Sequence, residues 1–232
     1  DQFGNTTAFG GNDFATFPDF PSEIRAPLGT TYGVSSYQIQ FAAKDIYTPG
    51  DTPEVLVCFN PAALKVNLDV VNKGGLIIVN EDEFTDKNLK KAGFDGNPLD
   101  PSSDTLKDFR VHKIPITTLT LQALDEMDMG HGDKLRCKNF LALGVVSWLF
   151  SRPLEPIEKF LNKKFGKKPQ VLEANLKVLH AGFNICDTME IFPVMYKVPP
   201  AKLEPGTYRN INGALATSYG LLVASQKIDI PI

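Results

Sequence analysis

Two short stretches near the start of the chain are typical of strands, one by its composition and the other by alternation of apolar and polar residues. The first stretch covers residues 13–17, and the second covers residues 34–41. Between them, the prolines and glycines of residues 18–33 stop a helix from passing through. We therefore expect a loop at the edge of a sheet, and this loop carries Glu23 and Arg25 two positions apart.

A continuous apolar run at 54–59 is typical of a parallel strand that is buried on both faces. Pro61 suits the first turn of a helix over residues 62–71, and residues 76–79 then form a second buried strand. A strand, a helix and a strand in this order make a right-handed βαβ unit. With a further strand at 110–116, the pattern predicts an α/β fold: a three-layer, Rossmann-like domain with a mostly parallel sheet, followed by C-terminal helices.

The second half of the chain repeats apolar residues at spacings of three and four, which predicts helices. The predicted helices cover residues 118–127, 134–151, 154–165 and 169–183. Residues 194–198 have the composition of a strand, and the Pro- and Gly-rich residues 199–206 resemble a linker. We therefore expect one domain at 1–198, a linker at 199–206 and a separate segment at 207–232 that contains a small-residue helix.

Composition places the chain among soluble globular proteins. Its 232 residues are 43% hydrophobic and 22% charged, with a mean hydropathy of -0.11. A net charge of -3, without a prominent basic block, gives no electrostatic footprint for nucleic acid. The longest apolar run, at 140–150, is too short to cross a bilayer, which takes about 20 residues. We therefore expect neither nucleic acid nor a membrane as a partner.

The three cysteines, Cys58, Cys137 and Cys186, are far apart in the sequence, and no C-x-x-C occurs. By itself the chain is therefore not expected to hold an iron–sulfur cluster or a metal ion. Scattered single cysteines fit a reducing compartment, so we expect a cytoplasmic protein. The three consecutive acids at 81–83 are expected to be exposed to solvent, because neighbours in a loop seldom converge on one ion.

Two places in the chain carry candidate binding groups. Loops on an α/β scaffold often present such groups, which makes Glu23 and Arg25 candidates; the alternative is an exposed ion pair of little energetic weight. Asn60 stands at the carboxyl end of a strand and the start of a helix, where open sheets bind ligands; alternatively, it only caps the helix. No G-x-G-x-x-G occurs beside Gly10-Gly11, which argues against a free-standing nucleotide-binding protein.

Several strings resemble one family in order along the chain. They are PSEIRAP at 21–27 with G-x-x-x-G-V-S-x-Y-Q at 29–38, VLVCFNPAALKVNL at 55–68, RCKNFLALG at 136–144, and the K-F, K-P and A-N pairs between 164 and 175. This set resembles the gamma domain in the alpha subunit of 2-oxoglutarate-type 2-oxoacid:ferredoxin oxidoreductases. R-x-I-x-G at 209–213 resembles the start of that family's thiamine-binding pyrimidine domain, although Ala214 stands where the family has Asn.

The resemblance implies a subunit of a complex that oxidatively decarboxylates a 2-oxoacid to an acyl-CoA and passes the electrons to ferredoxin. It favours 2-oxoglutarate as substrate, with pyruvate as the alternative. It also implies thiamine diphosphate, Mg2+ and [4Fe-4S] clusters in the complex, held outside these residues, with coenzyme A as co-substrate. The implied partners are a beta subunit that carries the thiamine and iron–sulfur sites, and ferredoxin, in a hetero-oligomer.

For the binding groups, the resemblance implies that Arg25 contacts a phosphate or carboxylate of coenzyme A or substrate. Glu23 would then orient Arg25, and Asn60 would supply a nearby hydrogen bond. A bidentate guanidinium suits either anion. Neither the residues nor the resemblance assigns a catalytic residue within this chain. The alternative function is a non-catalytic assembly module of such a complex.

Overall fold

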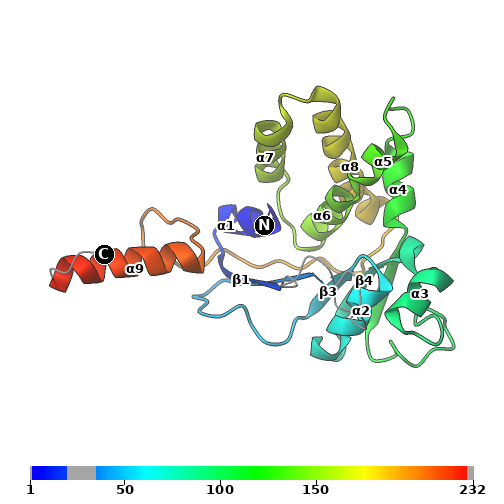
Figure 1. The fold of residues 1–232 in the computed structure, drawn as a ribbon, viewed down its shortest axis with the longest axis horizontal. Helices are drawn as coiled ribbons and strands as arrows, with labels where there is room; N and C mark the ends of the chain where they lie inside the picture. Colours follow the sequence, from blue (N-terminus) through cyan, green and yellow to red (C-terminus); the bar gives the residue numbers. More distant parts are fainter. Residues whose placement is uncertain (1, 20–34, 229–232) are drawn as a thin grey trace. The chain divides into compact units, whose positions relative to one another are not determined.

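The computed structural model describes residues 2–19 and 35–228 of the chain (Figure 1). The chain divides into two compact units, Asp1–Lys202 and Leu203–Ile232. Among the described residues, no helix combines the length and the apolar composition that crossing a membrane requires.

The first unit begins with a helix and a strand pair. Strands β1 (Asp13–Asp19) and β2 (Ser36–Ala42) are antiparallel and form their own two-stranded sheet. Both strands were predicted, β1 from its composition and β2 from its alternating pattern. Two-stranded ribbons are marginal alone, and this one packs through Phe41, whose ring lies 5.7 Å from that of Phe3 and 5.3 Å from that of Phe150.

Helix α1 (Gln2–Phe9) was not predicted, because glycine and threonine are poor helix formers. In the structure, the hydroxyl groups of Thr6 and Thr7 are buried and donate to the carbonyl oxygens of Gln2 and Phe3, at 3.0 and 2.9 Å. The helix therefore satisfies its own buried polar groups, while Phe3 packs in an aromatic cluster. Tertiary packing outweighs the low propensity.

The predicted parallel sheet is confirmed, with strand order β3-β4-β5. Its strands are β3 (Val55–Cys58), β4 (Leu76–Asn80) and β5 (Arg110–Ile114), and both pairings are parallel. The first crossover contains α2 (Pro61–Asn67) and the 3-10 turn η1 (Leu68–Val70). The second contains the 3-10 turn η2 (Glu81–Glu83) and helix α3 (Asp86–Ala92).

The central strand β4 is buried at every position, because helices cover both faces of the sheet. On one face, Ile77 and Val79 pack with Leu64 of α2 and Leu89 of α3. The other face packs against α4 (Ile116–Ala123), α6 (Lys138–Leu149) and α8 (Pro169–Thr188). The three-layer prediction is therefore correct (Figure 1).

Two predictions in the helical half are wrong in detail. The helix expected at 134–151 is divided into α5 (His131–Leu135) and α6 by a turn, where i→i+3 hydrogen bonds such as Phe140 N to Cys137 O, 2.9 Å, replace the regular pattern. Residues 194–198 form no strand. Instead, the Tyr196 amide donates to Leu149 O at 2.7 Å, and its carbonyl accepts from Ser151 Oγ at 3.1 Å, so this segment is held by the end of α6.

Helices α6 and α8 cross at two glycines, Gly144 and Gly182. A Cβ on Gly144 would lie 2.2 Å from the carbonyl oxygen of Leu179, and a Cβ on Gly182 would lie 2.1 Å from that of Leu141. Because real Cβ atoms cannot approach so closely, only glycine permits this crossing. Helix α7 (Glu155–Phe165) then packs beside α8 through Ile157 and other apolar residues.

The second unit contains helix α9 (Gly213–Ile228), as the small-residue pattern predicted. The side chain of Asn212 caps it by accepting a hydrogen bond from the Leu215 amide at 2.8 Å. None of its residues is buried within the described structure, and its large apolar side chains are 39–63% exposed.

Replacing Gly144 by alanine is expected to destabilise the first unit by about 3 kcal/mol, at the upper end of overpacking costs. The added methyl group meets backbone atoms of α8, which cannot rotate away as a side chain could. Gly132→Ala in α5 is the matched control, because its Cβ meets nothing within 4 Å. Urea unfolding of the three proteins measures the difference, and equal midpoints for Gly144→Ala and wild type would contradict the expectation.

Candidate functional site

The candidates Glu23 and Arg25 lie outside the described residues, so the structure assigns them no contacts. The strands on either side are described as far as the pair Asp19↔Ser36, which is the last pair between β1 and β2.

Asn60 follows β3 and is the N-cap of α2. Its Oδ1 accepts a hydrogen bond from the Ala63 amide at 2.8 Å, so the capping interpretation is correct. Its carbonyl accepts from the Leu64 amide at 3.3 Å. The Nδ2 group donates to no other residue that the structure describes, so the cap leaves both N–H donors of the Asn60 side chain available at the carboxyl end of the sheet.

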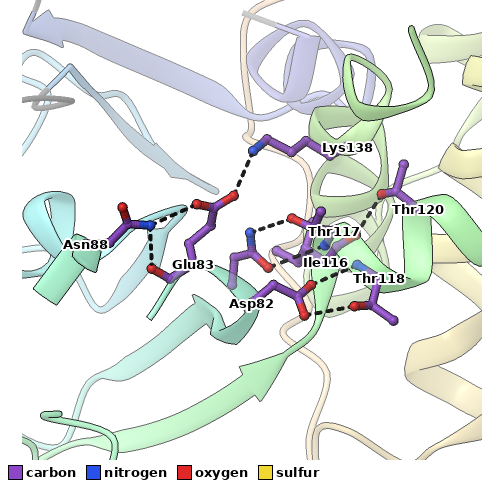
Figure 2. A network of polar contacts seen from close by, with 9 residues as sticks. Asp82, Glu83, Asn88, Ile116, Thr117, Thr118, Thr120 and Lys138 are labelled. Carbon is purple, nitrogen blue, oxygen red and sulfur yellow. Dashed lines mark hydrogen bonds and ion pairs between the residues drawn. The ribbon is translucent and has the colours of Figure 1, made fainter. Parts of the chain in front are cut away.

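The neighbouring strands end in a polar network that joins β4 to the start of α4 (Figure 2). Asn80, the last residue of β4, is fully buried. Its Nδ2 donates to Thr117 Oγ1 at 3.1 Å, and its Oδ1 accepts from the Thr117 amide at 3.4 Å. Both halves of the buried amide are thus satisfied by one residue, which is the condition for placing an amide in a core.

Asp82 completes the cap of α4 from another element. Its two carboxylate oxygens accept from the amide and the hydroxyl of Thr118, at 2.8 and 2.9 Å. The cap residue of α4 itself, Pro115, has no side-chain acceptor to offer. A carboxylate at a helix N-terminus satisfies free amides and lies in the favourable field of the helix dipole.

Glu83 links three elements through its side chain and its carbonyl (Figure 2). Its Oε1 lies 3.3 Å from Lys138 Nζ at the start of α6, and the two side chains are only 31% and 30% exposed. Asn88 of α3 donates to both Glu83 Oε2 and Glu83 O, at 3.2 and 2.9 Å. The expectation that the acids at 81–83 are solvated is therefore wrong for Asp82 and Glu83, and correct for Glu81, which is exposed.

The polar groups in the described part of this edge have a mainly structural role, because most of them form hydrogen bonds or ion pairs with one another. Within residues 2–19 and 35–228, no three His, Cys, Asp or Glu side chains form a group that could hold a metal ion. The Nδ2 group of Asn60 donates to no other described residue, so it remains available for hydrogen bonding at this edge. Sequence analysis identified Asn60 but missed Asn80, Asp82 and Thr118, since nothing in the sequence shows that a residue after β4 reaches the start of α4.

The cysteines are buried and free, and none forms a disulfide with another described residue. Burial raises the pKa of Cys58 to about 12 and that of Cys186 to about 12. Burial and the nearby charge of Asp133 also raise the pKa of Cys137. All three thiols are therefore held in the neutral form and act as small apolar side chains.

His180 lies beside an open groove of about 390 Å3 along α8, lined by residues that include Leu172, Leu176 and Lys177. Its Nε2 is 2.8 Å from Glu158 Oε1 of α7, so the histidine connects the two helices. This contact gives His180 a structural role.

Comparison with known proteins gives one family match and one curated relative. Residues 3–185 match the family model described as pyruvate ferredoxin/flavodoxin oxidoreductase. The 2-oxoglutarate oxidoreductase subunit KorA of Mycobacterium tuberculosis is 49% identical over 232 residues, which is 100% of this chain and 35% of the relative. The chain therefore spans about a third of the length of the curated relative that it matches.

Two solved structures share the fold. The 2-oxoglutarate:ferredoxin oxidoreductase from Magnetococcus marinus, solved with 2-oxoglutarate, coenzyme A and succinyl-CoA bound, aligns with a TM-score of 0.61 at 24% identity, over 87% of this chain and 30% of that one. The gamma subunit of a keto/oxoacid ferredoxin oxidoreductase from Geobacter sulfurreducens aligns with a TM-score of 0.50 at 14% identity, over 81% and 88%. At these identities the likeness shows the fold alone.

Asp82→Ala is expected to lower the free energy of unfolding by about 1 kcal/mol, the usual cost of a lost helix cap. Glu81→Ala is the matched control. Because Glu81 is exposed, this substitution should change the free energy of unfolding by less than about 0.5 kcal/mol. Chemical denaturation measures both variants, and hydrogen exchange at Thr118 reports the cap directly. Equal effects of the two substitutions would show that the Asp82 carboxylate contributes no more than an exposed acid.

Native protein is expected to resist alkylation by iodoacetamide at about pH 8, just below the ordinary thiol pKa. The reactive species is the thiolate, and all three buried thiols have raised pKa values. In denaturant, all three cysteines should be labelled, which intact-mass spectrometry counts. Labelling of Cys58 in the native protein at the denatured rate would contradict its enclosure.

Proposed function

The chain belongs to the pyruvate ferredoxin/flavodoxin oxidoreductase family, and we propose that it is part of a 2-oxoacid:ferredoxin oxidoreductase. The complex oxidatively decarboxylates a 2-oxoacid, with 2-oxoglutarate favoured over pyruvate, to an acyl-CoA and reduces ferredoxin. One observation carries this proposal: the chain is 49% identical, over its whole length, to a 2-oxoglutarate oxidoreductase subunit. The partners in this proposal are a beta subunit and ferredoxin, in a cytoplasmic hetero-oligomer.

We propose that residues 1–198 are the gamma domain, that 199–206 are a linker and that 207–232 begin a pyrimidine-binding domain. The boundary between the two compact units, at Lys202 and Leu203, supports this division because it falls within the proposed linker. The apolar side chains exposed on α9 support it too, since a helix that is apolar on all sides is typical of the interior of a larger structure.

The described residues do not fit the cofactors of the proposed reaction. Thiamine diphosphate supplies the carbanion stabilisation, and iron–sulfur clusters carry the electrons. A cluster requires converging thiolates, whereas Cys58, Cys137 and Cys186 are each buried and have raised pKa values. Mg2+ requires converging oxygen ligands, and the carboxylates of Asp82 and Glu83 already bind protein groups. We therefore place these cofactors on other residues of the complex.

The role proposed for this domain is to bind an anionic group of coenzyme A or the 2-oxoacid. Arg25 supplies the guanidinium, Glu23 orients it, and Asn60 supplies a hydrogen bond. The Nδ2 group of Asn60 that its capping role leaves available supports the third assignment. The alternative is that the domain only assembles the complex.

Arg25→Ala separates the two functions. If Arg25 binds an anion, its loss removes a charge-assisted hydrogen bond of about 1.5–3 kcal/mol, so KM for coenzyme A or the 2-oxoacid should rise about 10- to 100-fold. Lys44→Ala, an exposed cation just after β2, is the control for charge alone and should leave KM unchanged. Loss of assembly by Arg25→Ala, with unchanged kinetics in the complex that survives, would favour the assembly module.

Anoxic purification of the native protein tests the function as a whole. The expected result is a co-purifying subunit with cluster-forming cysteines, together with stoichiometric thiamine, iron and sulfide, and 2-oxoglutarate-dependent reduction of ferredoxin. Mass spectrometry and cofactor analysis measure these quantities. A chain that purifies alone and without cofactor would contradict the oxidoreductase proposal.

A further inference from the structure

A group of lysines follows the end of α7 and the turn that leads into α8 (Figure 1). Residues 159–168 include no acidic residue, and half of them are lysines. We call these exposed residues the basic patch: Lys159, Lys163, Lys164, Lys167 and Lys168. Because the whole chain has a net charge of -3, all its other residues together carry a net charge of -8. The patch is therefore a local excess of positive charge on an otherwise acidic chain.

The positive charges of the basic patch are not balanced locally. None of the five lysines forms an ion pair with an acidic residue that the structure describes. Lys164 instead makes cation–π contacts, with its Nζ 5.3 Å from the ring centroids of both Phe160 and Phe165. The patch thus differs from an ordinary exposed helix face, on which charges of both signs alternate and pair.

The position of two of these lysines is unfavourable for the fold itself. Positive charge in the last turn of α7 is stabilised by the helix dipole, but Lys167 and Lys168 lie at the start of α8, where the dipole favours an anion. No side chain caps α8, and the amides of Gln170 and Val171 donate to no other residue that the structure describes. A carboxylate from outside the chain would be favourable here on both counts.

The groove of about 390 Å3 along α8 begins beside the basic patch. Its first lining residues are Gly166 and Pro169, which flank the last two lysines of the patch. Leu172 and Leu176 follow, one helical turn apart on the same face of α8. Both leucines contact the core between α7 and α8 but are only partly buried, so an apolar strip remains along the groove.

Farther along α8, the charges at the groove are mostly balanced. Lys177 Nζ lies 3.8 Å from Glu126 Oε2, and His180 Nε2 lies 2.8 Å from Glu158 Oε1. Glu173, which also lines the groove, is exposed. The groove therefore has a basic end, at the turn between α7 and α8, and a remainder that is apolar and nearly neutral.

We propose that this groove binds an amphipathic helix of a partner protein, which has acidic residues at the end that reaches the basic patch. Apolar side chains three or four residues apart on that helix cover Leu172 and Leu176, as in other complexes in which a helix lies in a groove. Its carboxylates meet the lysines of the patch and the free amides at the start of α8. This inference goes beyond the proposed function, because it rests on the surface of this chain alone.

The competing explanation is a solvated surface, since exposed lysines need no partner and exposed ion pairs contribute little. It accounts for the charges in the last turn of α7, but not for two lysines at the uncapped start of α8 beside an apolar strip. A nucleic acid is a poorer fit than a protein. Among the described residues, no Phe, Tyr or Trp lines the groove to stack on a base, and the chain as a whole is acidic.

Carbodiimide cross-linking of the native complex tests the proposal, because it joins a lysine to a carboxylate only where the two are in contact. Mass spectrometry should find the lysines of the basic patch joined to one acidic segment of a partner subunit, with apolar residues three or four apart. Such links should become about ten-fold fewer in about 1 M sodium chloride, which screens charges beyond about 3 Å.

The internal controls are Lys73 and Lys107, which should give links within this chain because they pair with Asp108 and Asp104. If these links form while the basic patch is joined to no carboxylate, or only to carboxylates of its own polypeptide, the proposal is overturned. The same holds if the patch is joined to a segment without the apolar spacing.

Charge reversal separates binding from folding. Lys167→Glu combined with Lys168→Glu should raise the Kd of the partner subunit at least about ten-fold, measured by dilution of the complex in analytical ultracentrifugation. Urea unfolding should show no loss of stability, because the two acids suit the start of α8. Lys90→Glu combined with Lys91→Glu is the matched control, since these adjacent lysines of α3 are exposed and lie outside the groove. Equal Kd values for both double variants would overturn the proposal.

Discussion

Direct contact between the backbones of α6 and α8 determines where the helical layer lies on the sheet. Gly144 and Gly182 permit an approach at which any Cβ would overlap a carbonyl group of the other helix. The two helices pack together as one layer, and Leu141 and Val178 belong to the same core cluster as residues of β4. The position of α6 in turn determines where α5, the turn at Ser151 and the segment up to Tyr196 lie, because each of them adjoins α6 or is hydrogen-bonded to its end.

The carboxyl edge of the sheet is held by polar groups that satisfy one another. Asn80 and Asp82 bind the first turn of α4, while Glu83 connects α3 to α6 through Asn88 and Lys138. This edge of an open α/β sheet is where such folds generally bind ligands. In this chain most polar groups in the described part of the edge bind one another, whereas the Nδ2 group of Asn60 donates to no other described residue.

Arg152, a buried residue just beyond the end of α6, contrasts with that network. Both sites bury polar groups, but Asn80 finds donors and acceptors within the chain, whereas the guanidinium of Arg152 finds an aromatic face and a glycine. Burying a polar group without partners is energetically costly. The two places thus differ in whether the described residues supply hydrogen-bond partners for the buried polar group.

The sequence by itself determined the local elements and the family. Apolar runs and their periods identified β3, β4 and the main helices, because an element buried on both faces must be apolar throughout. Ordered motifs indicated the family that the comparisons confirm. Tertiary structure alone decided the features that depend on distant partners. It formed α1 from weak helix formers, held Tyr196 against α6 instead of in a strand, turned Asp82 into a cap for α4, and enclosed Arg152. The reason is that periodicity records which face of an element is buried, whereas hydrogen-bond partners and charge balance are set by residues that only the fold brings together.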